Sequence, residues 1–221
     1  MSTRSSSRFI FLLLFSIGFA TTAPAQASAR IVCFGDSITK RGYPAIVGEL
    51  LGVESINAGV GGHTSGEGLR RMTADVLEKN PDVVVIFFGT NDIRVDNAKK
   101  HTPPAKYQAN LEEMIAQCRK IDAKVVLCTL PPIKAEPFFQ RHDQKVFDAA
   151  GGLSALIMAQ QQAAIAAAKN HNVVLVDLQK ILLTEPKWMS PDGVHPSDEG
   201  NTIIANHIAK AIEPLLAGRF K

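Results

Sequence analysis

The predicted fold and site depend on one stretch of nine residues, Ile31-Val-Cys-Phe-Gly-Asp-Ser-Ile-Thr39. Its first four residues are apolar, which is typical of a buried strand. Gly35 then ends the strand, because glycine permits a tight turn without a Cβ clash. A serine at the carboxyl end of a strand directs its hydroxyl into the crevice where open α/β sheets bind ligands. Ser37 is therefore a candidate nucleophile, although a lone Gly-Asp-Ser is usually an ordinary polar turn.

Five short apolar runs alternate with helical patterns along the chain. The third run reads Val-Val-Val-Ile-Phe-Phe and does not alternate with polar residues, which fits a central parallel strand buried on both faces. The alternation of strands and helices predicts an α/β fold with a five-stranded parallel sheet and helices on both faces. The predicted strands are residues 31–34, 53–57, 83–88, 125–129 and 173–176. The predicted helices cover residues 42–51, 67–78 and 152–169, with a short helical turn over 177–183. Two more helices are predicted from their caps: one capped by Thr102, with Pro103 as its first residue, and one capped by Ser197.

The loops after the first three strands carry polar residues and glycines. Right-handed crossovers place these loops along one edge of the sheet, and they contain Ser37, Gly62 and Asn91. The loop over residues 188–197 contains Asp192 and His195, and it need only fold over the same edge for all five residues to meet.

Asp192 and His195 can supply the base that a serine nucleophile requires. Residues 191–196 read Pro-Asp-Gly-Val-His-Pro, and this spacing lets the loop turn the carboxylate back onto the imidazole, with Gly193 allowing the bend. Asp192 would fix the tautomer of His195, which would take the proton of Ser37. Taken alone, the pair is more often an ordinary turn.

Attack on an ester carbonyl creates an oxyanion that needs hydrogen-bond donors already in place. The candidates are the backbone N–H groups of Ser37 and Gly62 and the side-chain amide of Asn91. Each has an ordinary alternative, because a Gly-x-Gly is a weak motif and Asn91 can simply end a strand. The joint occurrence of these groups at the strand ends of one sheet is far less expected by chance.

Four ordered blocks together resemble the SGNH hydrolases, also called the GDSL lipase/esterase family, over residues 31–212. The resemblance implies a nucleophile at Ser37, oxyanion donors at Gly62 and Asn91, and a triad acid and base at Asp192 and His195. It also implies a three-layer, flavodoxin-like sandwich, since the Gly-x-Ser-x-Gly elbow of α/β-hydrolases is absent. The blocks are residues 35–38 (Gly-Asp-Ser-Ile), 57–62 (Asn-Ala-Gly-Val-Gly-Gly), 89–92 (Gly-Thr-Asn-Asp) and 192–196 (Asp-Gly-Val-His-Pro).

Within that family, Lys-Trp-Met at residues 187–189 resembles the periplasmic thioesterase/lysophospholipase type. His63 stands where those enzymes often carry an aspartate. Lysophospholipids or thioesters and carbohydrate O-acetyl esters therefore both stay open as substrates. The former need a long apolar groove, and the latter a short pocket with polar walls.

The first 27 residues have the pattern of a secretory signal peptide, which leaves residues 28–221 as one catalytic domain. Arg4 and Arg8 precede an apolar run over residues 9–20, and small residues follow it. Residues 28–221 contain 22 basic and 21 acidic side chains, so their charge gives no case for nucleic-acid binding. They hold no long apolar stretch, and we expect no membrane insertion after cleavage of the signal. The predicted location is periplasmic or secreted.

Other residues have less specific predicted roles. Asp36 should hydrogen-bond the loops of Ser37 and Asn91 together. Phe138 and Phe139, in the long connection over residues 131–150, either wall an acyl pocket or cover the sheet edge. Surface or loop positions are expected for the five other histidines, and buried thiols for the three cysteines, with a Cys33–Cys128 bridge only if their strands are neighbours. The histidines are His63, His101, His142, His171 and His207.

The predicted function is that of an exported serine ester hydrolase that forms an acyl-enzyme on Ser37, acts on a small-molecule ester and needs no metal or organic cofactor. The alternatives are an acyltransferase that passes the acyl group to a sugar hydroxyl, and a non-catalytic envelope-binding module. The sequence leaves the oligomeric state open.

Overall fold

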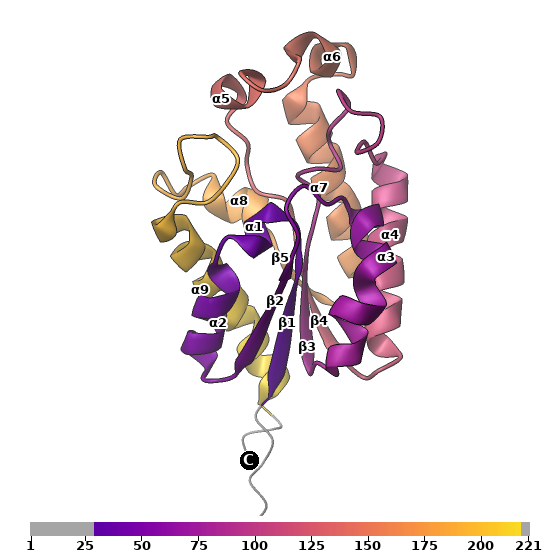
Figure 1. Ribbon diagram of the computed structural model, residues 1–221, viewed down its shortest axis with the longest axis vertical. Coiled ribbons are helices and arrows are strands. Elements are labelled where there is room, and N and C mark those ends of the chain that lie inside the picture. Colours follow the sequence, from indigo (N-terminus) through magenta and orange to yellow (C-terminus); the bar gives the residue numbers. More distant parts are fainter. Residues whose placement is uncertain (1–28, 218–221) are drawn as a thin grey trace, which may run out of the picture.

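The computed structural model describes residues 29–217, and its centre is a sheet of five parallel strands (Figure 1). The strand order is β2-β1-β3-β4-β5, so the chain starts inside the sheet, moves to one edge and then crosses to the other side. This arrangement confirms the predicted parallel sheet. The strands are β1 (Arg30–Gly35), β2 (Glu54–Gly59), β3 (Val83–Phe87), β4 (Lys124–Cys128) and β5 (Val174–Val176).

Helices cover both faces of the sheet, which confirms the three-layer prediction (Figure 1). One layer packs on the face that includes Ile31, Cys33 and Val85, and the other packs on the face that includes Val32, Phe34 and Val84. The first layer is α1 (Ser37–Lys40), α2 (Tyr43–Leu51), α8 (Leu178–Leu182) and α9 (Asp198–Leu216), and the second is α3 (Ser65–Asp75), α4 (Pro104–Arg119) and α7 (Leu153–Asn170).

The middle strand β3 explains why its sequence does not alternate. All five of its residues are buried, and they divide between the two cores. Val85 belongs to one apolar cluster, and Val84 and Ile86 belong to the other. A parallel strand covered by helices on both sides has no solvent-facing residue, so each position favours an apolar side chain.

The connection over residues 131–150 contains two short helices that the sequence analysis did not identify, α5 (Ala135–Phe139) and α6 (Gln144–Ala149). We call this connection the cap. It lies above the carboxyl ends of the strands in Figure 1. Phe138 and Phe147 are buried in a third apolar cluster that also includes Val194, from the loop that carries His195.

Five predicted helix starts differ from the structure: α2, α4, α7 and α8 each begin one residue later than predicted, and α3 begins two residues earlier. Thr102 is not the cap of α4, which begins at Pro104, because its N–H donates to the Asp92 carbonyl and its own carbonyl accepts from Gln160. Helix α3 begins at Ser65 rather than residue 67, because Thr64 and Glu67 form a reciprocal capping box. The predicted helical end of α3 is instead a separate turn of 3₁₀ helix, Leu77–Lys79.

The three cysteines are free and buried. Cys33 on β1 and Cys128 on β4 are separated by strand β3, so the condition for a bridge between them is not met. Burial raises the pKa of Cys33 and of Cys118 to about 12, which leaves both as inert thiols at neutral pH.

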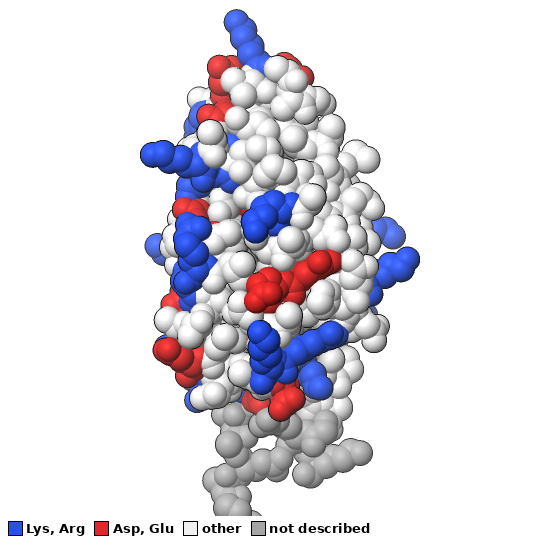
Figure 2. Space-filling view, turned by 90° about the vertical axis from the view of Figure 1, so that its right-hand side faces the viewer, with Lys and Arg blue, Asp and Glu red and all other residues white. Residues whose placement is uncertain are grey.

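Lys and Arg side chains are interspersed with Asp and Glu on the α3–α4 side of the molecule, so that face has no large patch of one sign (Figure 2). Among residues 29–217, no helix is both long and apolar enough to cross a membrane. The predicted signal peptide, residues 1–27, lies outside the described residues and stays a prediction.

Candidate active site

The loops at the carboxyl edge of the sheet bring Ser37, His195 and Asp192 into contact. Ser37 is the first residue of α1, directly after β1 and Asp36. Its Oγ lies 2.8 Å from Nε2 of His195, and Nδ1 of the same ring lies 2.5 Å from Oδ2 of Asp192. With Nδ1–H donating to the carboxylate, Nε2 is the acceptor for the Ser37 hydroxyl. The predicted chain of hydroxyl, imidazole and carboxylate is thus present as geometry.

The Asp192 carboxylate also organises its own loop. Its Oδ1 accepts hydrogen bonds from the backbone N–H groups of Val194 and His195 and from the hydroxyl of Ser190. These donors hold the pKa of Asp192 well below its usual range, against the opposing effect of burial. Gly193 has a φ of 76°, which a residue with a side chain rarely adopts. The short Asp-Gly-Val-His spacing therefore keeps Asp192 ionised and turned toward the imidazole.

The pKa of His195 is lowered from its ordinary value of 6.5. Partial burial is the largest cause, because it disfavours the charged ring, and the nearby charges of Arg41 and Arg141 act in the same direction. The hydrogen bond and charge of Asp192 oppose the shift without cancelling it. A neutral imidazole that can accept a proton is consequently the prevailing form at neutral pH.

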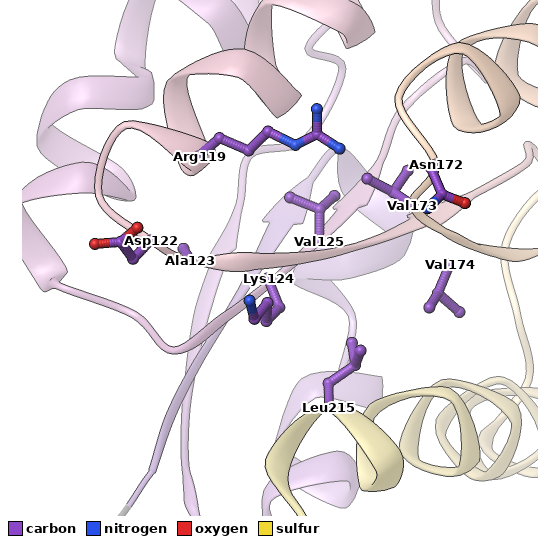
Figure 3. A pocket seen from close by; sticks show the side chains of 9 residues that line it. All are labelled: Arg119, Asp122, Ala123, Lys124, Val125, Asn172, Val173, Val174 and Leu215. Atoms are coloured by element: carbon purple, nitrogen blue, oxygen red, sulfur yellow. The ribbon is translucent and has the colours of Figure 1, made fainter. Parts of the chain in front are cut away.

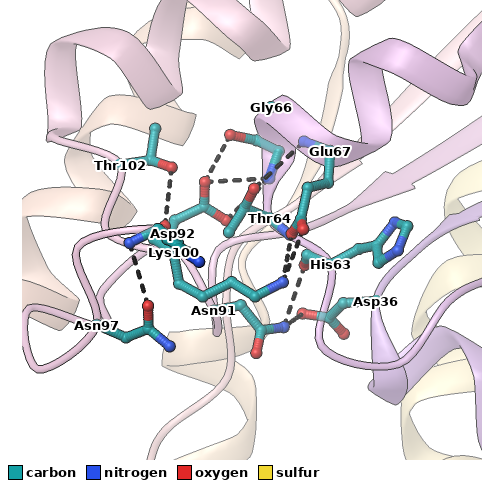
Figure 4. Close-up of polar contacts among 12 residues, drawn as sticks. Asp36, His63, Thr64, Gly66, Glu67, Asn91, Asp92, Asn97, Lys100 and Thr102 are labelled. Atoms are coloured by element: carbon teal, nitrogen blue, oxygen red, sulfur yellow. Dashed lines mark hydrogen bonds and ion pairs between the residues drawn. The ribbon is translucent and has the colours of Figure 1, made fainter.

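Two of the three predicted oxyanion donors have no acceptor among the described residues. These are the backbone N–H groups of Ser37 and Gly62, and both residues line the same cavity as His195. The third, Asn91, lines the cavity too, but its Nδ2 donates to Oδ2 of Asp36 at 3.3 Å and to the carbonyl of His63 at 3.1 Å (Figure 4). The side-chain amide of Asn91 is thus engaged within the site.

Asp36 makes the contacts predicted for it. Its Oδ1 accepts from the N–H of Ile38, and its Oδ2 accepts from Asn91, so the carboxyl group connects the first and third loops. Full burial raises the pKa of Asp36 to about 7, and the charge of Asp92 adds to this effect. Protonation of this carboxyl group is therefore far easier near neutral pH than that of an exposed aspartate.

A polar network behind the site fixes the glycine-rich loop (Figure 4). Asp92 is buried and accepts from both the N–H and the hydroxyl of Ser65, at the start of α3. Lys100 makes a 2.7 Å ion pair with Glu67, whose carboxylate also accepts from the N–H of Thr64. The residues that follow Gly62 are thereby anchored to the third loop, which carries Asn91.

Arg71 is a structural residue of the site that the sequence analysis missed. Its guanidinium lies 4.4 Å from the ring centre of Phe34 and donates to the carbonyls of Gly35 and Ala58, at the ends of β1 and β2. Its Nε also donates to Nδ1 of His63 at 3.2 Å. One side chain therefore holds the first two loops together, and no local motif around Arg71 signals this long-range role.

The cavity beside Ser37 has a volume of about 330 Å³. Phe138 of the cap lines it while remaining buried against Phe147, so this residue both forms a wall and covers the sheet edge. Phe139 does not line the cavity. His142, expected at a surface or loop position, lies in the loop between α5 and α6 and lines the cavity, with its ring centre 4.1 Å from that of Phe138 and its Nδ1 3.1 Å from Asp96. Three arginines, Arg41, Arg94 and Arg141, complete the polar part of the wall.

The cap and the loop of residues 190–196, which we call the base loop, are tied to each other. The N–H of Lys134 donates to the carbonyl of Gly193 at 2.8 Å, and Arg141 donates to the carbonyl of Asp192 at 2.6 Å. A Cβ at Gly193 would lie 2.3 Å from Pro137. The base loop can approach the cap this closely only because residue 193 is glycine.

Another hollow, of about 260 Å³, opens beside the starts of β4 and β5, at the far end of the sheet (Figure 3). Its lining includes Arg119, Lys124 and Asn172 but no serine, cysteine or histidine. Arg119 is directed at the carbonyl of His171. The hydroxyl, imidazole and carboxylate that acyl transfer requires meet at the opposite edge, near the cap.

Comparisons with known proteins point to one family of hydrolases. The model of the GDSL-like lipase/acylhydrolase family matches residues 33–203. An arylesterase of Vibrio mimicus is 27% identical over 93% of this chain and 97% of its own, and the thioesterase 1/protease 1/lysophospholipase L1 of Escherichia coli is 24% identical over 94% and 92%. The crystal structure of the acetyl xylan esterase AlAXEase has a TM-score of 0.68 and 30% identity, covering 83% of this chain and 99% of that one.

Proposed function

This chain belongs to the GDSL-like lipase/acylhydrolase family and is a carboxylic ester hydrolase, and from that premise we propose that it cleaves short-chain acyl esters through an acyl-enzyme on Ser37. The observation that carries the proposal is the continuous contact from Ser37 Oγ to His195 Nε2 and from His195 Nδ1 to Asp192 Oδ2. A serine needs an adjacent base, and the base needs an orienting acceptor. The proposal retains residues 1–27 as a signal peptide that exports the domain over residues 28–221, an assignment that amino-terminal sequencing of the exported enzyme decides.

In the first half-reaction, Ser37 Oγ attacks the ester carbonyl while Nε2 of His195 takes the hydroxyl proton. The tetrahedral intermediate collapses with cleavage of the bond to the alcohol oxygen, which receives that proton from His195. In the second half-reaction, His195 removes a proton from water, and the resulting hydroxide equivalent attacks the acyl-serine. Collapse of the second intermediate releases the carboxylic acid and returns the proton to Ser37. Asp192 remains ionised throughout and stabilises the imidazolium form of His195.

The backbone N–H groups of Ser37 and Gly62 are proposed as oxyanion donors because neither has an acceptor within residues 29–217 and both residues border the cavity. Asn91 would be the third donor after exchanging one of its two present partners for the substrate oxygen. The bond to Asp36 is the longer of the two, at 3.3 Å, and is the one more easily exchanged. The loss of a single donor of this kind costs about 3 kcal/mol in transition-state stabilisation.

The size and lining of the cavity favour a short acyl group. A volume of about 330 Å³ must hold the acyl group and part of the alcohol, and most of the residues around it are polar or charged. The apolar contribution comes chiefly from Phe138 and Val194. A long acyl chain gains binding energy only from a continuous apolar groove, roughly 0.8 kcal/mol for each buried CH₂ group. Acetyl esters therefore fit this site better than lysophospholipids.

We expect a strong preference for acetyl over lauroyl esters. The ratio of kcat/KM for p-nitrophenyl acetate to that for p-nitrophenyl laurate should be about tenfold or more, because Phe138 and Val194 offer a long chain only a short apolar wall. Initial rates below the solubility limit of the laurate measure this ratio. A preference for the laurate would contradict the short-acyl assignment, while leaving the triad assignment untouched.

The pH dependence of kcat/KM should follow the ionisation of His195. The free base is the active form, so activity is lost as the pH falls through the pKa of His195 and is kept above it. Burial and the charges of Arg41 and Arg141 lower that pKa, so the midpoint of the acid limb should lie below the ordinary value of 6.5. Rates with p-nitrophenyl acetate between about pH 4 and pH 8 measure it. A profile without an acid limb would count against His195 as the base.

A further inference from the structure

Among the described residues 29–217, three arginines and no acidic residue line the cavity beside Ser37. The arginines come from three different segments: Arg41 ends α1, Arg94 follows the third strand, and Arg141 lies in the cap between α5 and α6. They surround a space that also contains the nucleophile and its base, Ser37 and His195. The catalysis of ester hydrolysis outlined above makes no use of any of these guanidinium groups.

The positive charges are only partly neutralised by neighbouring carboxylates. Arg94 makes two hydrogen bonds with Asp96, at 2.7 and 3.0 Å. Arg41 lies 3.7 Å from the Asp192 carboxylate, and its guanidinium makes no hydrogen bond to any residue in the described range 29–217. Arg141 donates to the backbone carbonyl of Asp192 and has no carboxylate partner within that same range. Three positive charges therefore face two negative ones, which leaves a surplus of one.

Unused donors also point to a ligand. An arginine has five N–H donors in a planar fork that matches the geometry of carboxylate and phosphate groups. The side chain of Arg41 is 49% exposed, so its donors can reach a bound molecule without breaking an internal hydrogen bond. The charges of Arg41 and Arg141 also reach into the cavity, because both affect the ionisation of His195.

We propose that this enzyme prefers esters whose alcohol part carries a negatively charged group, a carboxylate or a phosphate, which Arg41 and Arg141 bind beside the catalytic base. This inference rests on the proposed function. The alcohol side is assigned because His195 must lie next to the leaving oxygen in order to protonate it. Both arginines line the cavity together with His195 and contact its partner Asp192. Arg94 lines the same cavity, but its charge is paired with that of Asp96.

The proposal is tested with aryl acetates that differ in charge. The wild-type enzyme is assayed with 4-acetoxybenzoate, with 4-acetoxyphenyl phosphate and with the neutral 4-acetoxybenzamide, at about 10 mM and about 500 mM salt. At low salt, kcat/KM for one or both anionic esters should exceed that for the neutral ester by roughly tenfold, and the difference should shrink at high salt. The first two compounds distinguish a carboxylate from a phosphate.

Variants then separate substrate binding from support of the base loop. Arg41→Gln and Arg141→Gln should each lower the ratio of anionic to neutral kcat/KM by several-fold, and the double variant should bring it close to that of the uncatalysed reaction. If these arginines only support Asp192, both esters slow by the same factor and the ratio stays unchanged, which overturns the proposal. If the double variant does not fold, Arg41→Gln alone decides, because its guanidinium makes no hydrogen bond within the described residues.

Arg119→Gln is the matched control, since Arg119 lies at the opposite end of the sheet and should leave both rates as in the wild type. The preference for anions is refuted if the wild-type enzyme hydrolyses all three esters at rates in proportion to their chemical reactivity. The ester hydrolase assignment stands in that case. Loss of the proposed function would look different, because Ser37→Ala would then still hydrolyse the neutral ester.

Discussion

Replacing Ser37 by alanine should lower kcat for p-nitrophenyl acetate by about 10⁵-fold, since a triad without its nucleophile retains only binding and oxyanion stabilisation. Ser37 Oγ is the atom 2.8 Å from His195 Nε2. The substitution removes one oxygen from a half-buried position, so the fold should persist. The measurement is the steady-state rate with enzyme free of contaminating esterase, together with a circular dichroism spectrum.

A fluorophosphonate probe gives an independent readout of the same residue. The wild-type protein should be labelled on the peptide that contains Ser37, and the alanine variant should not be labelled at all. Ser154→Ala is a suitable control because Ser154 is exposed on α7, away from the cavity. Retention of most of the activity in Ser37→Ala, or labelling at another serine, would contradict the proposed nucleophile.

Replacing Asp192 by asparagine should lower kcat by about 10⁴-fold with little change in the fold. The asparagine oxygen can still accept from the backbone N–H groups of Val194 and His195. Its amide NH₂ then faces Nδ1 of His195, which must become the acceptor, so the proton moves to Nε2. A ring protonated at Nε2 cannot accept the proton of Ser37, and the nucleophile loses its base.

The tautomer of His195 can be observed directly. Nitrogen chemical shifts of the imidazole should indicate a proton on Nδ1 in the wild type and on Nε2 in Asp192→Asn. Asp198→Asn serves as the control, because Asp198 is exposed at the start of α9, three residues after His195. An Asp192→Asn enzyme with nearly full activity would show that the carboxylate is needed only for the shape of the base loop.

The sequence predicted the sheet and the site because both are recorded in short local patterns. The fully apolar run that became β3 is typical of a strand buried on both sides, and its alternation with helical patterns predicted the parallel sheet. Each part of the candidate site stands at a position that the sequence marks locally. Ser37 and Asn91 come just after strands, and Asp192 and His195 lie in one tight loop. Right-handed crossovers then require the first loops to share one edge.

Features that depend on long-range contacts were not predicted. The role of Arg71 comes from the ends of two strands meeting its guanidinium, and the cavity position of His142 comes from the cap folding back over the sheet. The hydrogen bond from Asn91 to the carbonyl of His63 likewise requires the position of that carbonyl. A sequence of residue types does not contain these distances.

One local feature could have been found and was not. Thr64-Ser-Gly-Glu67 is a capping-box pattern that places the start of α3 at Ser65, where the structure has it. The two short helices of the cap were harder to identify, because a helix of one or two turns shows too little periodicity to stand out. Thr102 illustrates the opposite error, since a favourable cap residue was recruited into hydrogen bonds of the tertiary structure instead.

The attachment of the cap to the base loop limits how this enzyme can be re-engineered. Pro137 leaves no room for a side chain at Gly193. Lys134 and Arg141 donate hydrogen bonds to backbone carbonyls of the base loop. A designer who transplants residues 131–150 from a homologue to alter selectivity would thereby also misplace the imidazole. The smallest exchangeable module is consequently discontinuous in the gene, consisting of that segment and residues 190–196 together.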